Sequence, residues 1–223
     1  METLLRIWKK LGKPQPPPKA RAIEKVTVFG FADAKPADKV YKDAYKVCQS
    51  LAEAGYTVVD GGGPGVMEAA TLGAKAGGGK VIGVTFYPKD ADHFEGRDVS
   101  NPIDEEIKTT TYIERTLTLL KEGQVYIVFN GASGTMSEFG MAWGLARIYF
   151  GHHKPLILYG DFWQKIMRTL KANLLLRPEE LEVFKIATTP YQVLKAITEF
   201  EDEVEADRHK AMKVSSEDGF AIQ

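Results

Sequence analysis

One stretch of the chain, residues 124–143 (QVYIVFNGASGTMSEFGMAW), most strongly limits what this sequence can fold into. Residues 125–129 are apolar without alternation, which is typical of a strand buried on both faces of a parallel sheet. Small residues follow at 130–134 and allow a tight turn in which a ligand approaches the backbone. Beyond Thr135, apolar residues recur at helical spacing. The stretch therefore predicts a strand, a glycine-rich turn and a helix whose first N–H groups bind an anion.

Glu138 has two interpretations at this point. We expect it in the first turn of the helix, where its carboxylate would stand beside the anion site and take part in chemistry. The run from Thr135 to Glu138 also matches a capping box, in which both side chains satisfy backbone N–H groups and have no further role. The residues alone leave both interpretations open.

Strand and helix patterns alternate along the rest of the chain. Strands are predicted at 26–31, 56–59, 80–85, 125–129, 155–159 and 183–187, and helices at 36–54, 66–76, 110–121, 162–176 and 191–200. This alternation predicts an α/β fold, a doubly wound, mostly parallel Rossmann-like sheet with helices on both faces. Residues 86–108 are polar and lack a clear pattern, so we expect a lid or binding loop there.

The helix predicted at 110–121 divides its residues between two faces. Ile113, Leu117 and Leu120 share one face, and Arg115 belongs to the opposite, polar face with two threonines. From the pattern alone, Arg115 is therefore a solvated surface arginine.

The predicted organisation is one domain at 25–200. Residues 1–24 form an N-terminal arm with a proline-rich connector, and residues 201–223 form a charged tail. The net charge of −1 gives no reason to expect a nucleic-acid or membrane partner. The single cysteine, Cys48, fits a helix facing the core and a reducing compartment, so we expect a cytoplasmic protein.

Two glycine-rich turns follow two predicted strands, at 61–65 and at 131–134. In an open parallel sheet, such turns meet at the carboxyl edge of the strands, where ligands bind. Neither turn has the spacing of a Walker motif or of a dinucleotide fingerprint. The two turns together favour a phosphorylated small molecule as the ligand.

These motifs, GGGPGVMEAA at 61–70 and GxxGTxxE at 131–138, resemble those of the LOG family, the cytokinin riboside 5′-monophosphate phosphoribohydrolases. The resemblance implies a Rossmann-like fold and a homodimer with the site near the subunit interface. It also implies hydrolysis of a nucleoside 5′-monophosphate to free base and ribose 5-phosphate, without a cofactor or metal.

The resemblance also implies roles for individual residues. Arg115 and Glu138 match the catalytic arginine and glutamate of the family. The phosphate would be held by Gly131, Ser133, Gly134 and Thr135. The wall of the nucleotide pocket would comprise Gly62, Gly63, Gly65, Met67 and Glu68.

Three departures from the family's pattern set this sequence apart. Asn130 and Ala132 replace a proline and a glycine of the usual phosphate loop, Thr116 replaces a lysine beside the arginine, and Phe31 replaces a serine after the first strand.

Two other functions compete with hydrolysis. Molybdenum-cofactor carriers are similar in fold and glycine loops, and they hold a phosphorylated pterin without cleaving it. A single-strand DNA binder would need a basic groove, for which the sequence offers only the N-terminal arm.

Overall fold

The structure is a computed structural model that describes residues 23–88, 96–148 and 155–205. Its strands are β1 (Lys25–Phe29), β2 (Thr57–Asp60), β3 (Val81–Phe86), β4 (Glu105–Thr109), β5 (Val125–Val128), β6 (Leu156–Tyr159) and β7 (Phe184–Ala187). Its helices are α2 (Lys39–Glu53), α3 (Val66–Ala76), α4 (Tyr112–Glu122), α5 (Ser133–Ile148), α6 (Phe162–Asn173) and α7 (Pro190–Glu205), with a 3-10 turn, η1, at Pro178–Leu181. Residues 1–22 of the arm predicted at 1–24, and the tail beyond Glu205, lie outside the described residues.

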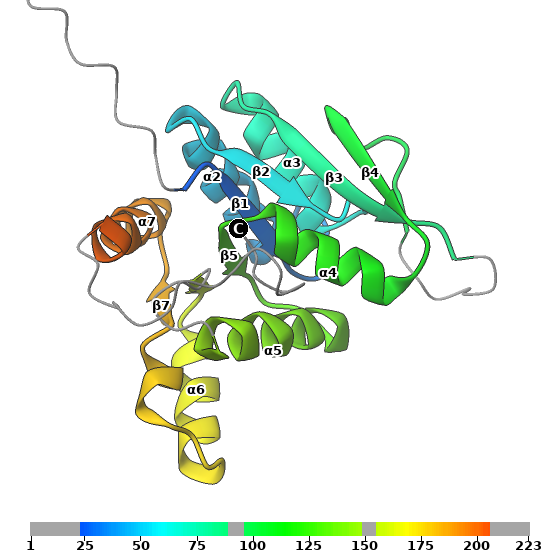
Figure 1. The fold of residues 1–223 in the computed structure, drawn as a ribbon. Coiled ribbons are helices and arrows are strands. Elements are labelled where there is room, and N and C mark those ends of the chain that lie inside the picture. Colours follow the sequence, from blue (N-terminus) through cyan, green and yellow to red (C-terminus); the bar gives the residue numbers. More distant parts are fainter. Residues whose placement is uncertain (1–22, 89–95, 149–154, 206–223) are drawn as a thin grey trace, which may run out of the picture.

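The strands form one seven-stranded sheet in the order β4-β3-β2-β1-β5-β6-β7. Every neighbouring pair is parallel, and β1 lies between β2 and β5. The chain therefore builds outward from β1 in one direction as far as β4 and in the other from β5 to β7 (Figure 1). This is the predicted doubly wound α/β fold, and the turns after β1 and β5 lie at its switch point.

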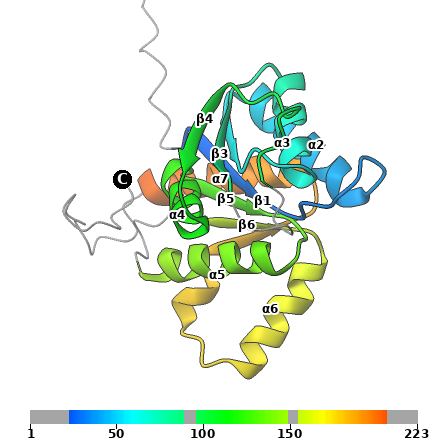
Figure 2. The same ribbon diagram turned by 90° about the vertical axis from the view of Figure 1, so that its right-hand side faces the viewer.

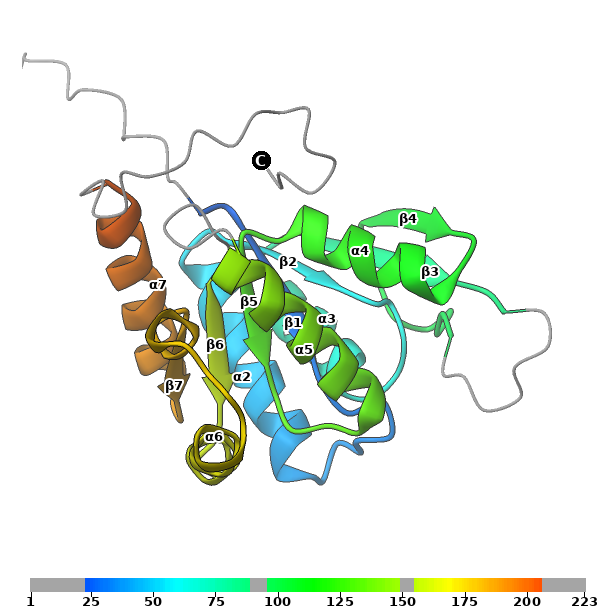
Figure 3. The same ribbon diagram turned by 60° about the horizontal axis from the view of Figure 1, so that its bottom comes forward.

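Helices cover both faces of the sheet. One apolar core joins the sheet to α2, α3 and α7, and a second core joins the other face to α4, α5 and α6. Figure 3 shows α4 and α5 in front of the sheet, with α2 and α3 behind it. Figure 2 shows α5 and α6 together below the sheet, where the Trp143 indole on α5 donates to the Glu180 carbonyl of η1 at 2.6 Å. Cys48 is buried in the first core, as predicted.

The structure corrects three sequence-based boundaries. Residues 105–109, predicted to be part of a lid, form the edge strand β4, whose polar sequence (EEIKT) gave no strand signal because only Thr109 in it is buried. Helix α5 begins at Ser133, two residues before Thr135, and α7 continues to Glu205, into the predicted tail. In the described part of the chain, no helix is long and apolar enough to cross a bilayer.

Candidate functional site

A cavity of about 250 Å³ lies where the turns after β1, β2 and β5 meet. Its lining combines these turns with α3, α4 and the start of α5: Val28, Phe29, Gly30, Phe31, Ala32, Asp33, Gly61, Met67, Tyr112, Arg115, Leu119, Ala132, Ser133, Gly134, Thr135 and Glu138. Strand β1 contributes because it lies beside both β2 and β5, and this places its turn between the two predicted glycine turns. The cavity is thus at the expected edge of the sheet.

The first turn of α5 forms one side of this cavity. Ser133, Gly134 and Thr135 all line it, and within the described ranges their backbone N–H groups have no hydrogen-bond acceptor. The first helical hydrogen bond here runs from the N–H of Met136 to the Ala132 carbonyl at 3.0 Å. Unpaired N–H groups and the positive end of the helix dipole make this turn suited to a phosphate.

The capping-box interpretation of Glu138 is wrong. Because α5 begins at Ser133, Thr135 is inside the helix, and the first turn contains no acidic residue. Glu138 therefore falls in the next turn, too far along the helix to cap its start. The sequence obscured this boundary because Ala132, the residue before the helix, has no side-chain acceptor to mark it.

The Glu138 side chain is buried. It lines the cavity, is only 8% exposed, and has no hydrogen-bond or ion-pair partner among the described residues. Burial raises the pKa of Glu138 to about 7, and the positive charge of Arg115 opposes that rise. A buried carboxylate is costly without a partner, so this arrangement is typical of a functional group and unlike a structural one.

Arg115 reaches the same cavity from α4. It is 5% exposed, whereas Ile113 on the same helix is 58% exposed, so the prediction of a solvated arginine is wrong. Its Nε donates to the Val84 carbonyl at 3.0 Å, and its Nη2 donates to the Gly61 carbonyl at 3.2 Å and contacts Met67 Sδ at 3.4 Å. These backbone carbonyls satisfy part of the guanidinium and make its burial tolerable.

The glycine turn after β2 contributes few residues to the cavity wall, and its other residues contact the elements around the cavity. Only Gly61 and Met67 of this motif line the cavity. Gly62, at φ +64°, donates its N–H to the Asp60 carboxylate at 2.7 Å, and the Gly63 carbonyl accepts from Asn101 at 3.0 Å. Gly65, at φ +67°, packs against the Ala32 carbonyl and leaves no room for a Cβ.

Glu68 and Gly131, also singled out in the sequence, lie outside this lining. The Glu68 carboxylate accepts from the Tyr41 hydroxyl at 3.0 Å on the α2 side. Gly131 lines a neighbouring cavity, and a Cβ there would collide with the Thr135 side chain.

Sequence reasoning missed Asp60, the last residue of β2. Asp60 is fully buried and accepts from the Gly62 N–H and from the Thr71 hydroxyl at 2.8 Å. Burial raises its pKa to about 6, although those bonds and the charges of Arg115 and Arg97 lower it. The sequence signal for Asp60 was a carboxylate at the end of a buried strand, immediately before three glycines.

Among the described residues, no group of three His, Cys, Asp or Glu side chains could hold a metal ion.

Three known proteins show what this chain is similar to. An uncharacterized protein of Archaeoglobus fulgidus is 28% identical over 123 residues, which cover 55% of this chain and 77% of the relative. The molybdenum cofactor binding protein of Rippkaea orientalis is 26% identical with a TM-score of 0.59, over 80% of this chain and 97% of that one. DNA processing protein A of Streptococcus pneumoniae is 20% identical with a TM-score of 0.52, over 78% of this chain and 61% of that one, and shares the fold alone.

The match to a protein family covers the larger part of the chain. It spans residues 24–176, from β1 to the residues just after α6, and so includes every residue that lines the cavity. The chain therefore belongs to the SLOG cluster4 family.

Proposed function

We propose that this protein binds a nucleoside 5′-monophosphate and hydrolyses its N-glycosidic bond. The observation that carries the proposal is the Glu138 carboxylate, which is buried in the cavity without a hydrogen bond from the described residues and shares the cavity with Arg115. A carboxylate repels a bound phosphate, so its burial beside the start of α5 favours a chemical role over ligand holding alone.

The phosphate would bind at the first turn of α5. The N–H groups of Ser133, Gly134 and Thr135 supply donors, and Arg115 adds a fixed positive charge to the same cavity. The ribose would then extend from that turn toward Glu138, which follows Thr135 by one turn of helix.

The chemistry follows from the charges. When the C1′–N bond breaks, its electron pair leaves with the base, and positive, oxocarbenium-like charge develops on the ribose. The ionised Glu138 would stabilise that charge and orient a water molecule whose oxygen bonds to C1′. One proton of that water ends on the base, and the products are free base and ribose 5-phosphate.

A carrier for a phosphorylated small molecule is the second candidate. It is supported by the similarity to the Rippkaea orientalis molybdenum cofactor binding protein, which extends over 97% of that chain. A carrier would use the same helix start for a phosphate and would leave Glu138 without chemistry.

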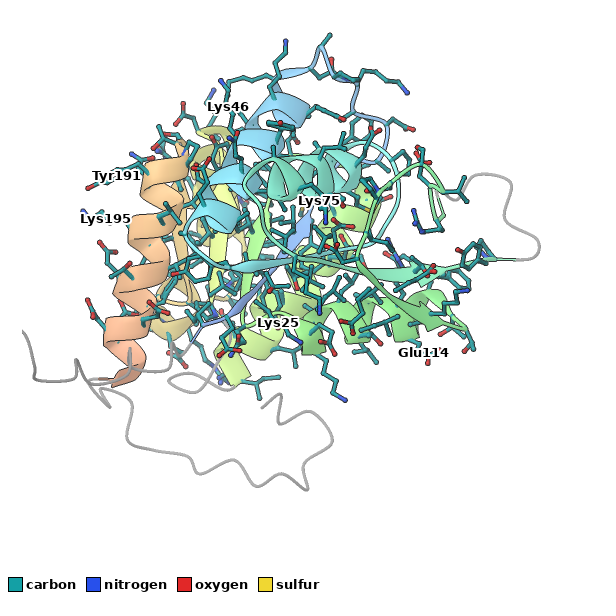
Figure 4. The ribbon with its side chains drawn as sticks, turned by 90° about the horizontal axis from the view of Figure 1, so that it is seen from above. Lys25, Lys46, Lys75, Glu114, Tyr191 and Lys195 are labelled. Atoms are coloured by element: carbon teal, nitrogen blue, oxygen red, sulfur yellow. The ribbon has the colours of Figure 1, made fainter. Side chains whose placement is uncertain are left out.

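The test is release of base from a panel of nucleotides by the full chain. We expect the wild type to release base and ribose 5-phosphate from at least one of AMP, GMP, CMP, UMP and a cytokinin riboside monophosphate. Glu138→Gln should lower that rate by ~10²–10³, the usual cost of one transition-state contact. Glu114→Gln is the matched control, because Glu114 lies on the exposed side of α4, pointing away from the core (Figure 4).

Each of three other outcomes would contradict part of the proposal. Full activity of Glu138→Gln would leave hydrolysis standing but remove the carboxylate from the mechanism. A wild type that binds nucleotides or a phosphorylated pterin but releases no base would favour the carrier. Salt-dependent binding of single-stranded DNA, with no binding of small phosphates, would contradict both candidates.

A further inference from the structure

A second cavity, of about 240 Å³, adjoins the first. It is lined by Phe31, Val40, Asn130, Gly131 and Ala132, and two of these residues, Phe31 and Ala132, also line the first cavity. Neither cavity alone reaches the ~300–1,000 Å³ typical of small-molecule sites, whereas the two together do. One ligand of ordinary size would therefore occupy both.

The two cavities differ in charge. The first contains Arg115, the N–H groups at the start of α5 and two carboxylates, Glu138 and Asp33. Among the described residues, no charged side chain lines the second cavity, and two of its walls, Phe31 and Val40, are apolar. A phosphate would consequently favour the first cavity, and an uncharged part of the same ligand would favour the second.

Phe31 is held in place at the boundary between the cavities. Its N–H donates to the Asn130 carbonyl at 3.1 Å, and its own carbonyl accepts from the Val66 N–H at 3.0 Å. The backbone is thus fixed by β5 and α3, while 36% of the residue remains exposed. A large aromatic ring with a fixed backbone and an open face is suited to stacking on a flat ligand ring.

Asn130 supplies the polar edge of the second cavity. Its backbone carbonyl is used by Phe31, but its side-chain amide has no hydrogen-bond partner in the described part of the chain and is exposed. An amide presents an acceptor and two donors, which match the alternating donors and acceptors on the edge of a nitrogen heterocycle.

We propose that the second cavity is a subsite for a flat nitrogen heterocycle, a purine or a pterin, that is joined to the phosphate bound at the start of α5. Phe31 stacks on the ring, and Asn130 hydrogen-bonds its edge. The subsite rests on the proposed phosphate site but not on hydrolysis, because a hydrolase and a carrier would both need to hold the ring.

The experiment compares ligands with and without a ring by titration calorimetry. The probes are ribose 5-phosphate, AMP and a pterin carrying one phosphate, and the full chain carries Glu138→Gln so that AMP is not consumed. We expect AMP or the pterin to bind at least tenfold more tightly than ribose 5-phosphate. Comparison of the affinities for AMP and the pterin then shows whether the subsite prefers a purine or a pterin ring.

Phe31→Ala should then weaken ring-containing probes about tenfold and change ribose 5-phosphate less than twofold. Phe31→Trp should retain the affinity, and the new indole should be quenched by the bound ring. Tyr191→Ala is the matched control, because this ring is exposed on α7, projects outward from the molecule (Figure 4) and lines neither cavity.

The results separate failure of the subsite from failure of the phosphate site. Equal binding of all three probes, or an equal loss for all three in Phe31→Ala, would overturn the subsite and leave the phosphate site standing. A different result would overturn the phosphate site: the ring-containing probes bind, but ribose 5-phosphate does not compete with them. The proposal that one ligand occupies both cavities would then fail as well. Absence of binding by every probe would contradict both proposals.

Discussion

The guanidinium of Arg115 donates a hydrogen bond to the carbonyl oxygen of Gly61 at 3.2 Å, and this contact joins helix α4 to the turn after β2. The same turn is anchored one residue later, where Gly62 donates to Asp60 at 2.7 Å. Asp60 is itself held by Thr71 of α3. The position of the cation in the cavity therefore depends on a glycine turn that contributes few of the cavity's own walls.

The first prediction follows from the lack of room for a side chain at Gly61. A Cβ at this position would collide with Arg115 Nη2 and approach Met67 Sδ to 2.7 Å, so Gly61→Ala should displace the guanidinium while the fold is kept. We expect it to weaken binding of ribose 5-phosphate about tenfold, as Arg115→Ala should. Calorimetry measures both variants. The control is Gln164→Ala, an exposed position on α6 that lies outside the cavity and the proposed dimer face, and wild-type affinity in Gly61→Ala would show that Arg115 does not depend on this contact.

The second prediction concerns the pH dependence of turnover. Burial raises the pKa of Glu138 to about 7, and the mechanism uses its ionised form. The value of kcat/KM should therefore rise as pH increases through about 7 and level off above it. Base release measured from pH 5 to 9 tests this. A fall over the same range would instead indicate that the protonated form is active, as a general acid.

The third prediction is that removal of this carboxylate stabilises the protein. The folded-state pKa of about 7 lies above the ordinary 4.5, so the folded state binds its proton more tightly than the unfolded state. Stability from this group is complete below about pH 4.5 and is lost as pH rises to 7. The loss is on the order of 3–4 kcal/mol, since the two pKa values differ by about 2.5 and one pKa unit corresponds to ~1.4 kcal/mol.

Glu138→Gln should consequently exceed the wild type in free energy of unfolding by more at pH 8 than at pH 5. Urea unfolding of both proteins at the two pH values measures the difference, in which the other titrating groups largely cancel. An equal difference at both pH values would mean that Glu138 titrates near its ordinary pKa.

The fourth prediction is a homodimer formed through α5. Met136, Gly140, Gly144 and Ile148 recur every four residues on the exposed side of this helix, and a Cβ at either glycine meets no other atom within 4 Å. Such a face allows a second helix to approach closely. Light scattering should give twice the chain mass of 24.7 kDa, and Gly140→Arg should give a monomer, whereas Gln164→Arg on α6 should not. A wild type near 24.7 kDa would contradict the prediction.

The sheet could be predicted from sequence because its central strands are continuous apolar runs bounded by glycine. Helix α3 was placed at its observed ends, 66 and 76, since Gly65 and Gly77 bracket it. Strand β4 could not be found, because an edge strand with one buried residue has no apolar run. The buried face of α4 was also misjudged, since an arginine satisfied by two backbone carbonyls is indistinguishable in a helical pattern from one in water.

The location of the site could be predicted from the sequence, but the roles of several of its residues could not. Two glycine turns after parallel strands located the cavity, because parallel strands bring their carboxyl ends to one edge. Whether a glycine shapes a turn or faces a ligand depends on tertiary contacts, such as those of Gly62 with Asp60. Three positions that depart from the LOG motifs, Phe31, Asn130 and Ala132, prove to line one cavity, and that proximity exists only in the fold.

The hydrogen bond between Phe31 and Asn130 also determines at which stage of folding the site forms. It joins turns from opposite halves of the chain, after β1 and β5, so a nascent chain has no site until β5 and the start of α5 have been synthesised and β5 has paired with β1. Such distant pairings form late and set the pace of refolding. A ligand of this site should therefore slow unfolding and leave the refolding rate unchanged, because it binds only after the sheet has closed.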